Sequence, residues 1–188
     1  MLSLLPRKFY SYDTVTVAKE LLGKKLVRKI GTQTISGIIT ETEAYRHSDD
    51  PASHAYKKKT ERNKAMFEEV GKAYVYFTYG MYFCFNVVAR NQKLEAGAVL
   101  IRAIHPEKGK EIMMKNRDKK NDKGLVNGPA KLTQAFAITK KHYGLDLTNN
   151  QELYITEGIQ SGKITASPRI GIKTALDKLW NFKMSVNT

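Results

Sequence analysis

Cysteine is nearly absent from this sequence, and long hydrophobic runs are missing. Cys84 is the single cysteine in 188 residues, which excludes an internal disulfide, a zinc site built on cysteines and a Cys-ligated iron–sulfur cluster. The apolar stretch at the N-terminus is short and is followed by Pro6, so we expect neither a signal peptide nor a membrane anchor. These absences predict a cytoplasmic protein with no membrane partner.

Acidic residues are scarce relative to basic ones. The chain has 32 Lys and Arg against 18 Asp and Glu, a formal net charge of +14. One basic run, such as residues 57–59, is typical of a solvated surface, but an excess spread along the chain favours a polyanionic partner such as nucleic acid. The length suits one domain with its own core, to which we assign residues 1–188.

Aromatic residues are concentrated in residues 73–88, which read AYVYFTYGMYFCFNVV. Residue types that favour strands lie on both sides of Gly80, which can adopt a positive φ. The pattern predicts a β-hairpin whose tip presents Tyr79, flanked by Met81 and Tyr82. An aromatic side chain at such a tip either packs under a neighbouring loop or enters a partner, and the pattern favours neither.

Hydrophobic periodicity predicts the other elements. We expect helices over residues 13–22, over 60–70, from 106 and from 129, and strands over 25–30, 34–45, 97–104, 153–155 and 169–172. This mixture predicts an α+β fold. The expected architecture is a single compact domain in which a curved, mostly antiparallel sheet carries peripheral helices and a protruding hairpin.

The strand predicted over residues 34–45 carries the first candidate catalytic groups. A period of two places Glu41, Glu43 and Tyr45 on the face that begins at Ile35. A carboxylate on an apolar face is partly desolvated, which suits it to act as a general base or leaves it in need of a cation. Alternatively, both glutamates lie at the rim of the sheet and only form ion pairs.

A single charge interrupts the apolar run over residues 97–104. Because the guanidinium of Arg102 stays charged, it must find an acceptor, and Glu41 and Glu43 are the candidates. A meeting of these groups in a cleft is a candidate active site.

Two histidines lie in the polar loop that follows. Pro51 precedes His54 and can fix its imidazole near the end of the glutamate strand, although a lone loop histidine is more often a surface residue. His47, Asp49, Asp50 and His54 lack the spacing of a helical metal-binding pair, so we assign no metal.

Seven blocks in this order resemble the alkyladenine (3-methylpurine) DNA glycosylase family and cover most of the chain. They are TETEAY at 40–45, DDPASHAY at 49–56, RNKAMF at 62–67, YVYFTYGMYFCFNVV at 74–88, AVLIRAIHP at 98–106, NGPAKLTQAFAI at 127–138 and RIGI at 169–172.

The resemblance implies roles for individual residues. Glu43 matches the general base for the attacking water, Arg102 helps to hold that water, and Glu41 is structural. The implied base pocket consists of Tyr45, His54, Tyr76, Asn86 and the segment around Ile170. Tyr79 matches the side chain that enters the DNA and fills the gap left by the flipped nucleotide, with Met81 and Tyr82 beside it.

The implied activity is base-excision repair by a monofunctional DNA N-glycosylase. Such an enzyme flips damaged purines out of double-stranded DNA and hydrolyses the N-glycosidic bond with an activated water, leaving an abasic site. The implied substrates are 3-alkyladenine and 7-alkylguanine, and also hypoxanthine and ethenoadenine. No cofactor and no lyase step are implied, and we expect a monomer, associated with the nucleoid if the source is prokaryotic.

Two other functions use the same features. A non-catalytic damaged-DNA-binding module would share the basic surface and the tyrosine hairpin, whereas a metal-dependent nuclease is disfavoured because no acidic ligand cluster is present.

The chain also departs from the family pattern, since its tail KLWNFKMSVNT is shorter than the usual closing strand. This departure predicts weaker packing beneath the pocket. The lysine-rich loop at 118–124 is a second individual feature, and we expect it to add salt-sensitive DNA affinity.

Overall fold

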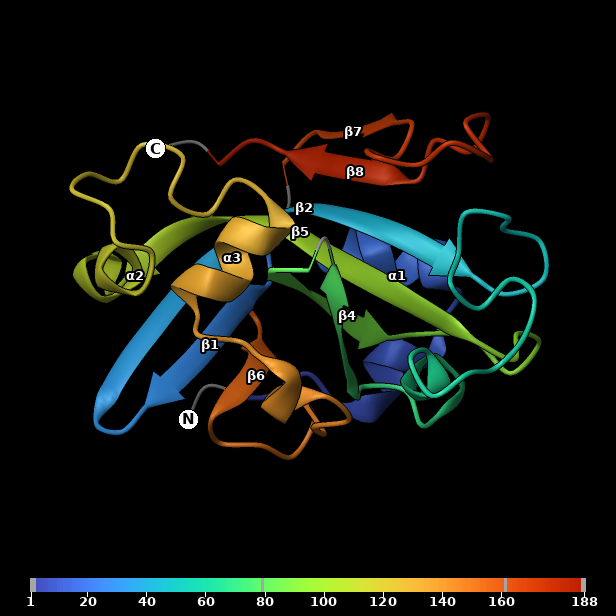
Figure 1. Cartoon of the computed structure of the whole chain (residues 1–188), viewed down its shortest axis with the longest axis horizontal. Helices are drawn as coiled ribbons and strands as arrows, with labels where there is room; N and C mark the ends of the chain where they lie inside the picture. The colour runs from blue at the N-terminus through green and yellow to red at the C-terminus, as the bar shows by residue number, and fades with distance from the viewer. Residues whose placement is uncertain (1–2, 79, 161, 187–188) are drawn as a thin grey trace.

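The computed structural model describes residues 3–78, 80–160 and 162–186. Within these residues, eight antiparallel strands form one curved sheet (Figure 1). The strands follow the order β3-β4-β5-β2-β1-β6, and β8 pairs with both β2 and β7. They are β1 (Lys25–Ile30), β2 (Gln33–Arg46), β3 (Ala73–Thr78), β4 (Tyr82–Val88), β5 (Gly97–Lys108), β6 (Leu153–Thr156), β7 (Ile164–Ser167) and β8 (Asn181–Met184).

Short helices lie around this sheet, so the predicted α+β fold is confirmed (Figure 1). The α-helices are α1 (Thr14–Glu20), α2 (Lys110–Asn116) and α3 (Pro129–Ala135), and the 3-10 helices are η1 (Arg7–Ser11), η2 (Lys64–Phe67) and η3 (Lys140–His142). The carboxylate of Asp13 accepts a hydrogen bond from the amide of Val15 and caps α1. Pro129 occupies the first turn of α3, as the sequence predicts.

Two helices differ from the prediction. The helix expected over residues 60–70 shortens to η2. The helix expected from Pro106 begins only at Lys110, because β5 pairs with β2 as far as Lys108 and Gly109 then turns the chain with a φ of +76°.

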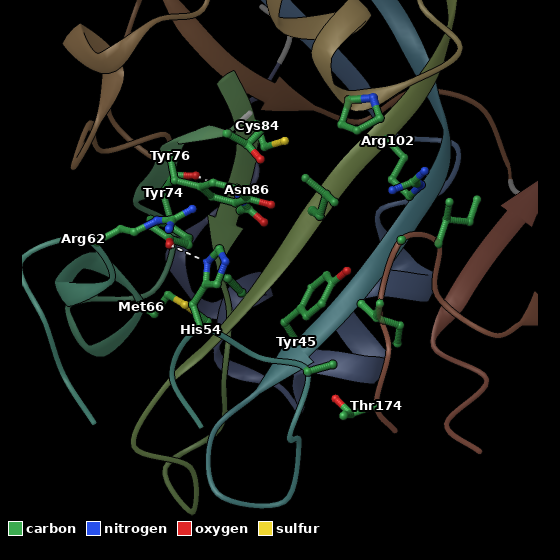
Figure 2. Close-up of a pocket in the computed structure, with 18 of the residues that line it drawn as sticks. Tyr45, His54, Arg62, Met66, Tyr74, Tyr76, Cys84, Asn86, Arg102 and Thr174 are labelled. Carbon is green, nitrogen blue, oxygen red and sulfur yellow. Dashed lines mark hydrogen bonds between the residues drawn. The ribbon is translucent and has the colours of Figure 1, made fainter. Parts of the chain in front are cut away.

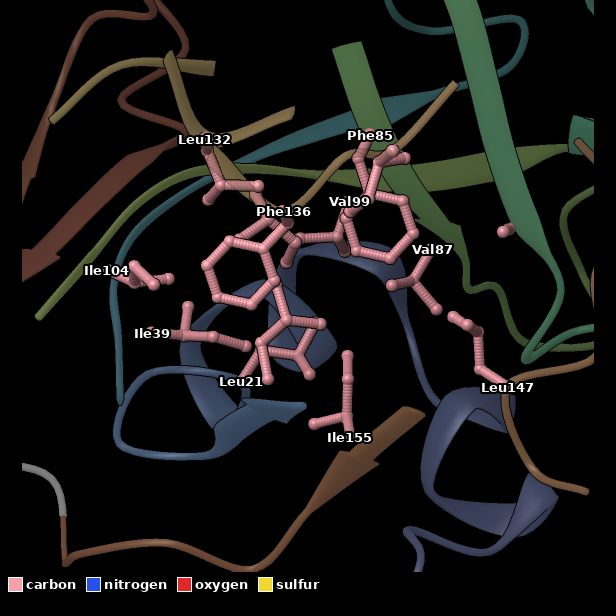
Figure 3. Close-up of a cluster of buried hydrophobic side chains, with 14 of the residues drawn as sticks. Leu21, Ile39, Phe85, Val87, Val99, Ile104, Leu132, Phe136, Leu147 and Ile155 are labelled. Atoms are coloured by element: carbon pink, nitrogen blue, oxygen red, sulfur yellow. The ribbon is translucent and has the colours of Figure 1, made fainter. Parts of the chain in front are cut away.

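The main hydrophobic core lies between the sheet and helices α1 and α3 (Figure 3). Leu21 follows α1, Phe136 follows α3, and Ile39 and Val99 come from β2 and β5; all four are fully buried. Alternate residues of β3, β4 and β5 join this core. The intervening side chains therefore point away from it.

A β-bulge in β2 decides which side chains face the core. The register against β5 shifts between Ile39 and Glu41 and again before Thr42. Ile39 and Ala44 both belong to the core, and the Thr42 hydroxyl donates to a carbonyl of α1. An extra residue in one strand inverts the side-chain alternation. The prediction that Glu43 continues the face of the earlier isoleucines was therefore wrong, because Glu43 points to the opposite side.

The predicted hairpin is formed by β3 and β4, which pair along their whole length. Gly80 turns the tip with a φ of +68°. Met81 is 63% exposed, and Tyr82 is half-buried. Tyr79, the predicted tip residue, lies outside the described residues.

The C-terminal segment corrects one prediction. Residues 169–172 were expected to form a strand, but they form a turn in which Gly171 has a φ of +79°. The short tail, which left the packing of the final strand in doubt, forms β8, pairs with β2 at residues 41–43 and buries Phe182 in the core. Among the described residues, no helix is long and apolar enough to cross a membrane.

Candidate active site

A cavity of about 420 Å³ opens beside the hairpin (Figure 2). Its wall is formed by side chains that alternate with core residues along three strands: Tyr74 and Tyr76 of β3, Cys84 and Asn86 of β4, and Ala98, Leu100 and Arg102 of β5. The loop after β2 adds His54, and the turn at residues 170–174 forms the opposite side. The volume is typical of a site for a small organic group.

Glu43 lies directly behind this cavity and has no exposed surface. Its Oε2 accepts hydrogen bonds from the Tyr45 hydroxyl at 2.8 Å and from Nη1 of Arg102 at 3.3 Å. Its Oε1 accepts from the backbone amide of Ile170 at 2.7 Å and from Nδ2 of Asn181 at 3.0 Å. These donors satisfy both oxygens of the Glu43 side chain. Three of the four residues also line the cavity and connect Glu43 to it.

The predicted meeting of Arg102 with the two glutamates is confirmed. Nε of Arg102 donates to Oε1 of Glu41 at 2.9 Å, and Nη1 donates to Glu43. Burial alone would lower the pKa of Arg102, but the two carboxylates outweigh it and raise that pKa. Glu41 also accepts from Asn181 at 2.8 Å and lies 3.6 Å from the ammonium of Lys183. Glu41 therefore anchors Arg102 through Nε, while Glu43 contacts Nη1.

His54 is exposed to solvent, but its ring also packs against an aromatic wall. Its Nδ1 lies 2.9 Å from the Tyr74 hydroxyl, and its ring meets Tyr76 edge to face with centroids 4.7 Å apart (Figure 2). Burial, and to a smaller extent the charge of Arg62, lowers the pKa of His54 to about 4. The imidazole is therefore neutral near pH 7. Burial also raises the pKa of Tyr76, so its phenol stays protonated.

Tyr45 faces this wall across the cavity (Figure 2). The guanidinium of Arg169 lies over the Tyr45 ring, 4.7 Å from its centroid, and 5.2 Å from the ring of Trp180. Burial first, and then the carboxylate of Glu43, raises the pKa of Tyr45. Its hydroxyl therefore remains the donor to Glu43.

The structure brings together most of the predicted site residues. Those that line or back the cavity are Glu43, Tyr45, His54, Tyr76, Asn86, Arg102 and Ile170. Met81 and Tyr82 lie outside it and line a second hollow against α3. Within the described part of the chain, no three His, Cys, Asp or Glu residues are grouped as metal ligands. Asp50, considered for such a site, binds Arg169 instead.

Sequence reasoning missed several residues of the site. Asn181 holds both glutamates, but it lies 138 residues beyond Glu43 in a short tail whose pairing no local pattern reveals. Tyr74, which holds His54, has the same period of two as Tyr76 along β3 and could have been found from that alternation. Arg62 lines the cavity and falls inside the block at residues 62–67. Nothing in the residues around it indicated a role in binding or catalysis.

A buried carboxylate held by arginine, behind an aromatic cavity and beside an exposed hairpin in a basic chain, defines a site suited to hydrolysis at a base turned out of a nucleic acid. The model of the methylpurine-DNA glycosylase (MPG) family matches residues 8–188. The chain belongs to this family, whose name supports a DNA glycosylase of base-excision repair.

Relatives from several organisms agree with this assignment. Three of them bear the name "Putative 3-methyladenine DNA glycosylase". A protein of Carboxydothermus hydrogenoformans is 49% identical, with 98% of this chain and 96% of the relative covered. A protein of Clostridium acetobutylicum is 46% identical, with 97% and 95% covered. A protein of Chlamydia felis is 47% identical, with 97% of each covered.

Proposed function

We propose that this protein releases damaged purines from duplex DNA by hydrolysing the N-glycosidic bond with a water activated by Glu43. The observation that carries this proposal is the environment of Glu43, a fully buried carboxylate whose donors Tyr45, Arg102 and Ile170 also line the cavity. A water bound between Arg102 and the Ile170 segment lies within reach of the carboxylate, which takes its proton as the water attacks the sugar.

The target base must leave the helix before this chemistry, because its glycosidic bond is inaccessible in a stacked duplex. Tyr79 fills the vacated space, with Met81 and Tyr82 against the groove. The exposure of Met81, 63%, supports this role, since an apolar side chain in solvent gains from burial against bases. Damaged pairs open at lower cost, which contributes to selectivity.

The flipped purine stacks between Tyr45 on one side and the wall of Tyr76 and His54 on the other. Aromatic faces attract any purine and attract a cationic alkylated purine more strongly. Asn86 is held by a hydrogen bond of 3.0 Å from its Nδ2 to the carbonyl of Tyr74. In this proposal Asn86 lies against the purine edge and crowds the 2-amino group of guanine, and the hydrogen bond that fixes its amide supports this role.

The bond breaks through an oxocarbenium-like transition state, as in inverting glycoside hydrolysis. An alkylated purine such as 3-alkyladenine or 7-alkylguanine is already a good leaving group. Hypoxanthine and ethenoadenine are neutral and need a proton on the leaving base. We propose all four as substrates, with residues 1–188 acting as one glycosylase domain and as a monomer.

Strand analysis of a duplex carrying a single ethenoadenine or hypoxanthine tests this function. A monofunctional enzyme gives cleavage only after alkali, which cuts at the abasic product. Lys173 lines the cavity, so cleavage without alkali would point to this amine as a nucleophile and would contradict the monofunctional assignment. Tight binding with no release from these or from alkylated duplexes would leave a damage-binding module.

A further inference from the structure

Arg62 has a fixed place in the cavity wall. Its guanidinium lies 5.4 Å from the centroid of the Tyr76 ring, and its Nη2 donates to the carbonyl of Phe77 at 3.3 Å (Figure 2). The neighbouring Asn63 is buried and donates from Nδ2 to the carbonyls of His54 at 2.7 Å and Lys58 at 3.0 Å. The backbone that carries Arg62 is therefore tied to the backbone that carries His54.

The charge of Arg62 has no counter-ion among the residues that the structure describes. Among the described residues, no carboxylate lies within 4.0 Å of its guanidinium. Arg102, the other arginine of the cavity, differs because Glu41 and Glu43 both bind it. Lys173, on the opposite side of the cavity, also pairs with none of the described carboxylates.

This charge lies beside the surface on which a base would stack. A purine against Tyr76 comes close to Arg62, and a permanently cationic purine meets a like charge there. A neutral purine meets no such repulsion and can gain from stacking near a guanidinium. The aromatic wall favours cationic lesions, so Arg62 opposes that preference.

We propose that Arg62 is a specificity-determining residue that shifts the pocket toward neutral damaged bases and away from cationic ones. The proposal rests on the proposed function, because it assigns a role to Arg62 in the same base pocket. It acts on the bound base and not on the attacking water. Arg62 is exposed to solvent, so salt screens the effect.

Arg62→Gln tests this role by removing the charge while keeping a polar side chain. We expect the ratio of kcat/KM for a 7-methylguanine duplex to that for an ethenoadenine duplex to rise about fivefold to tenfold. Most of the change should appear in KM for the cationic lesion, and it should shrink at high salt. Arg62→Lys keeps the charge and should restore most of the wild-type ratio.

Lys57→Gln is the matched control, since Lys57 is an exposed cation of the same loop that does not line the cavity. It should lower both kcat/KM values equally, or change neither. If Arg62→Gln lowers kcat/KM equally for the two lesions, Arg62 contacts phosphate and not the base. If it changes neither value, Arg62 does not affect the bound base. Either result leaves the ratio unchanged and would overturn the proposal.

Dissociation constants give a second, independent readout. The ratio of Kd values for the two lesion duplexes, measured in a Glu43→Gln background, should shift in the same direction when Arg62 is replaced. This readout needs no catalysis, so failure of the proposed function appears as absent base release, whereas failure of the inference appears as an unshifted Kd ratio.

Discussion

Asp50 and Arg169 form an ion pair in which neither side chain is exposed. Nη1 and Nη2 of Arg169 each donate to one carboxylate oxygen of Asp50 at 2.6 Å, and Nη1 also donates to the carbonyl of Ala44 at 2.9 Å. Asp50 lies in the loop that leads to His54, and Arg169 precedes Ile170, whose amide contacts Glu43. One buried contact thus joins the two segments that flank the cavity.

Removal of Arg169 should destabilise the protein strongly. Arg169→Met leaves the Asp50 carboxylate buried without its partner, which costs about 3–5 kcal/mol of unfolding free energy. Urea denaturation measures this cost. Arg7→Met is the matched control, because Arg7 pairs with Asp146 at 2.5 Å in a partly exposed position and should cost about 1 kcal/mol or less. Equal losses in the two variants would contradict the importance of the buried pair.

The Tyr45 hydroxyl should stabilise Glu43 directly. Tyr45→Phe keeps the ring but removes the donor at 2.8 Å, which should cost about 1.5–3 kcal/mol because a charged acceptor loses a hydrogen bond. Base release should slow while lesion affinity stays near wild type. Thermal unfolding and single-turnover kinetics measure the two effects. Tyr56→Phe, in an exposed position, should change neither, and a Tyr45→Phe protein of unchanged stability would count against the hydrogen bond.

The low pKa of His54 should make the free energy of unfolding depend on pH. The folded pKa is about 4, against an unfolded value of about 6.5. The unfolded chain therefore binds more protons between these values, and stability falls as the pH drops from 6.5 toward 4. Because His54 lines an open cavity and remains accessible to solvent on one side, the effect is limited to about 1 kcal/mol. Denaturation at pH 7 and pH 5 should show a smaller loss for His54→Gln than for wild type; parallel losses would contradict the assignment.

The lysine-rich loop should contribute to DNA affinity without sequence preference. Lys119, Lys120 and Lys123 are exposed, and each phosphate contact they make steepens the salt dependence of binding by about 0.9 in log–log slope. Replacing all three by glutamine should flatten the slope for undamaged duplex by up to about 2.7. Lys29→Gln, at an exposed position on the otherwise mostly buried β1, is the control. An unchanged slope in the triple variant would exclude the loop from the DNA-binding surface.

The hairpin was predictable because its sequence signal is local. The contacts of Arg102 with the two glutamates were predictable because a charge on an apolar strand requires a partner. Strand-forming residues around Gly80 specify a turn with positive φ, and this turn is observed. Arg102 on an apolar strand required an acceptor, and Glu41 and Glu43 supply it. The resemblance to the glycosylase blocks supplied the remaining roles.

The features that could not be predicted from the sequence depend on contacts between residues far apart in the chain. A bulge in β2 reversed the expected face of Glu43, and no sequence pattern reports where an extra residue interrupts a ladder. Asp50 and Arg169 lie 119 residues apart, and Asn181 reaches Glu43 only because β8 pairs with β2. Periodicity also predicted a strand at residues 169–172, where hydrogen bonds to Glu43 and Asp50 instead hold a turn.

The most direct test of the account compares Glu43→Gln with Glu41→Gln on a duplex carrying one ethenoadenine. Glutamine preserves the shape of both side chains, but only Glu43 is proposed to accept the proton of the attacking water. We predict that Glu43→Gln binds the lesion as tightly as wild type or more tightly and releases no detectable base, while Glu41→Gln, which keeps Glu43 but weakens the anchor of Arg102, releases base at a reduced rate. Base release by Glu43→Gln at the wild-type rate would contradict the central claim.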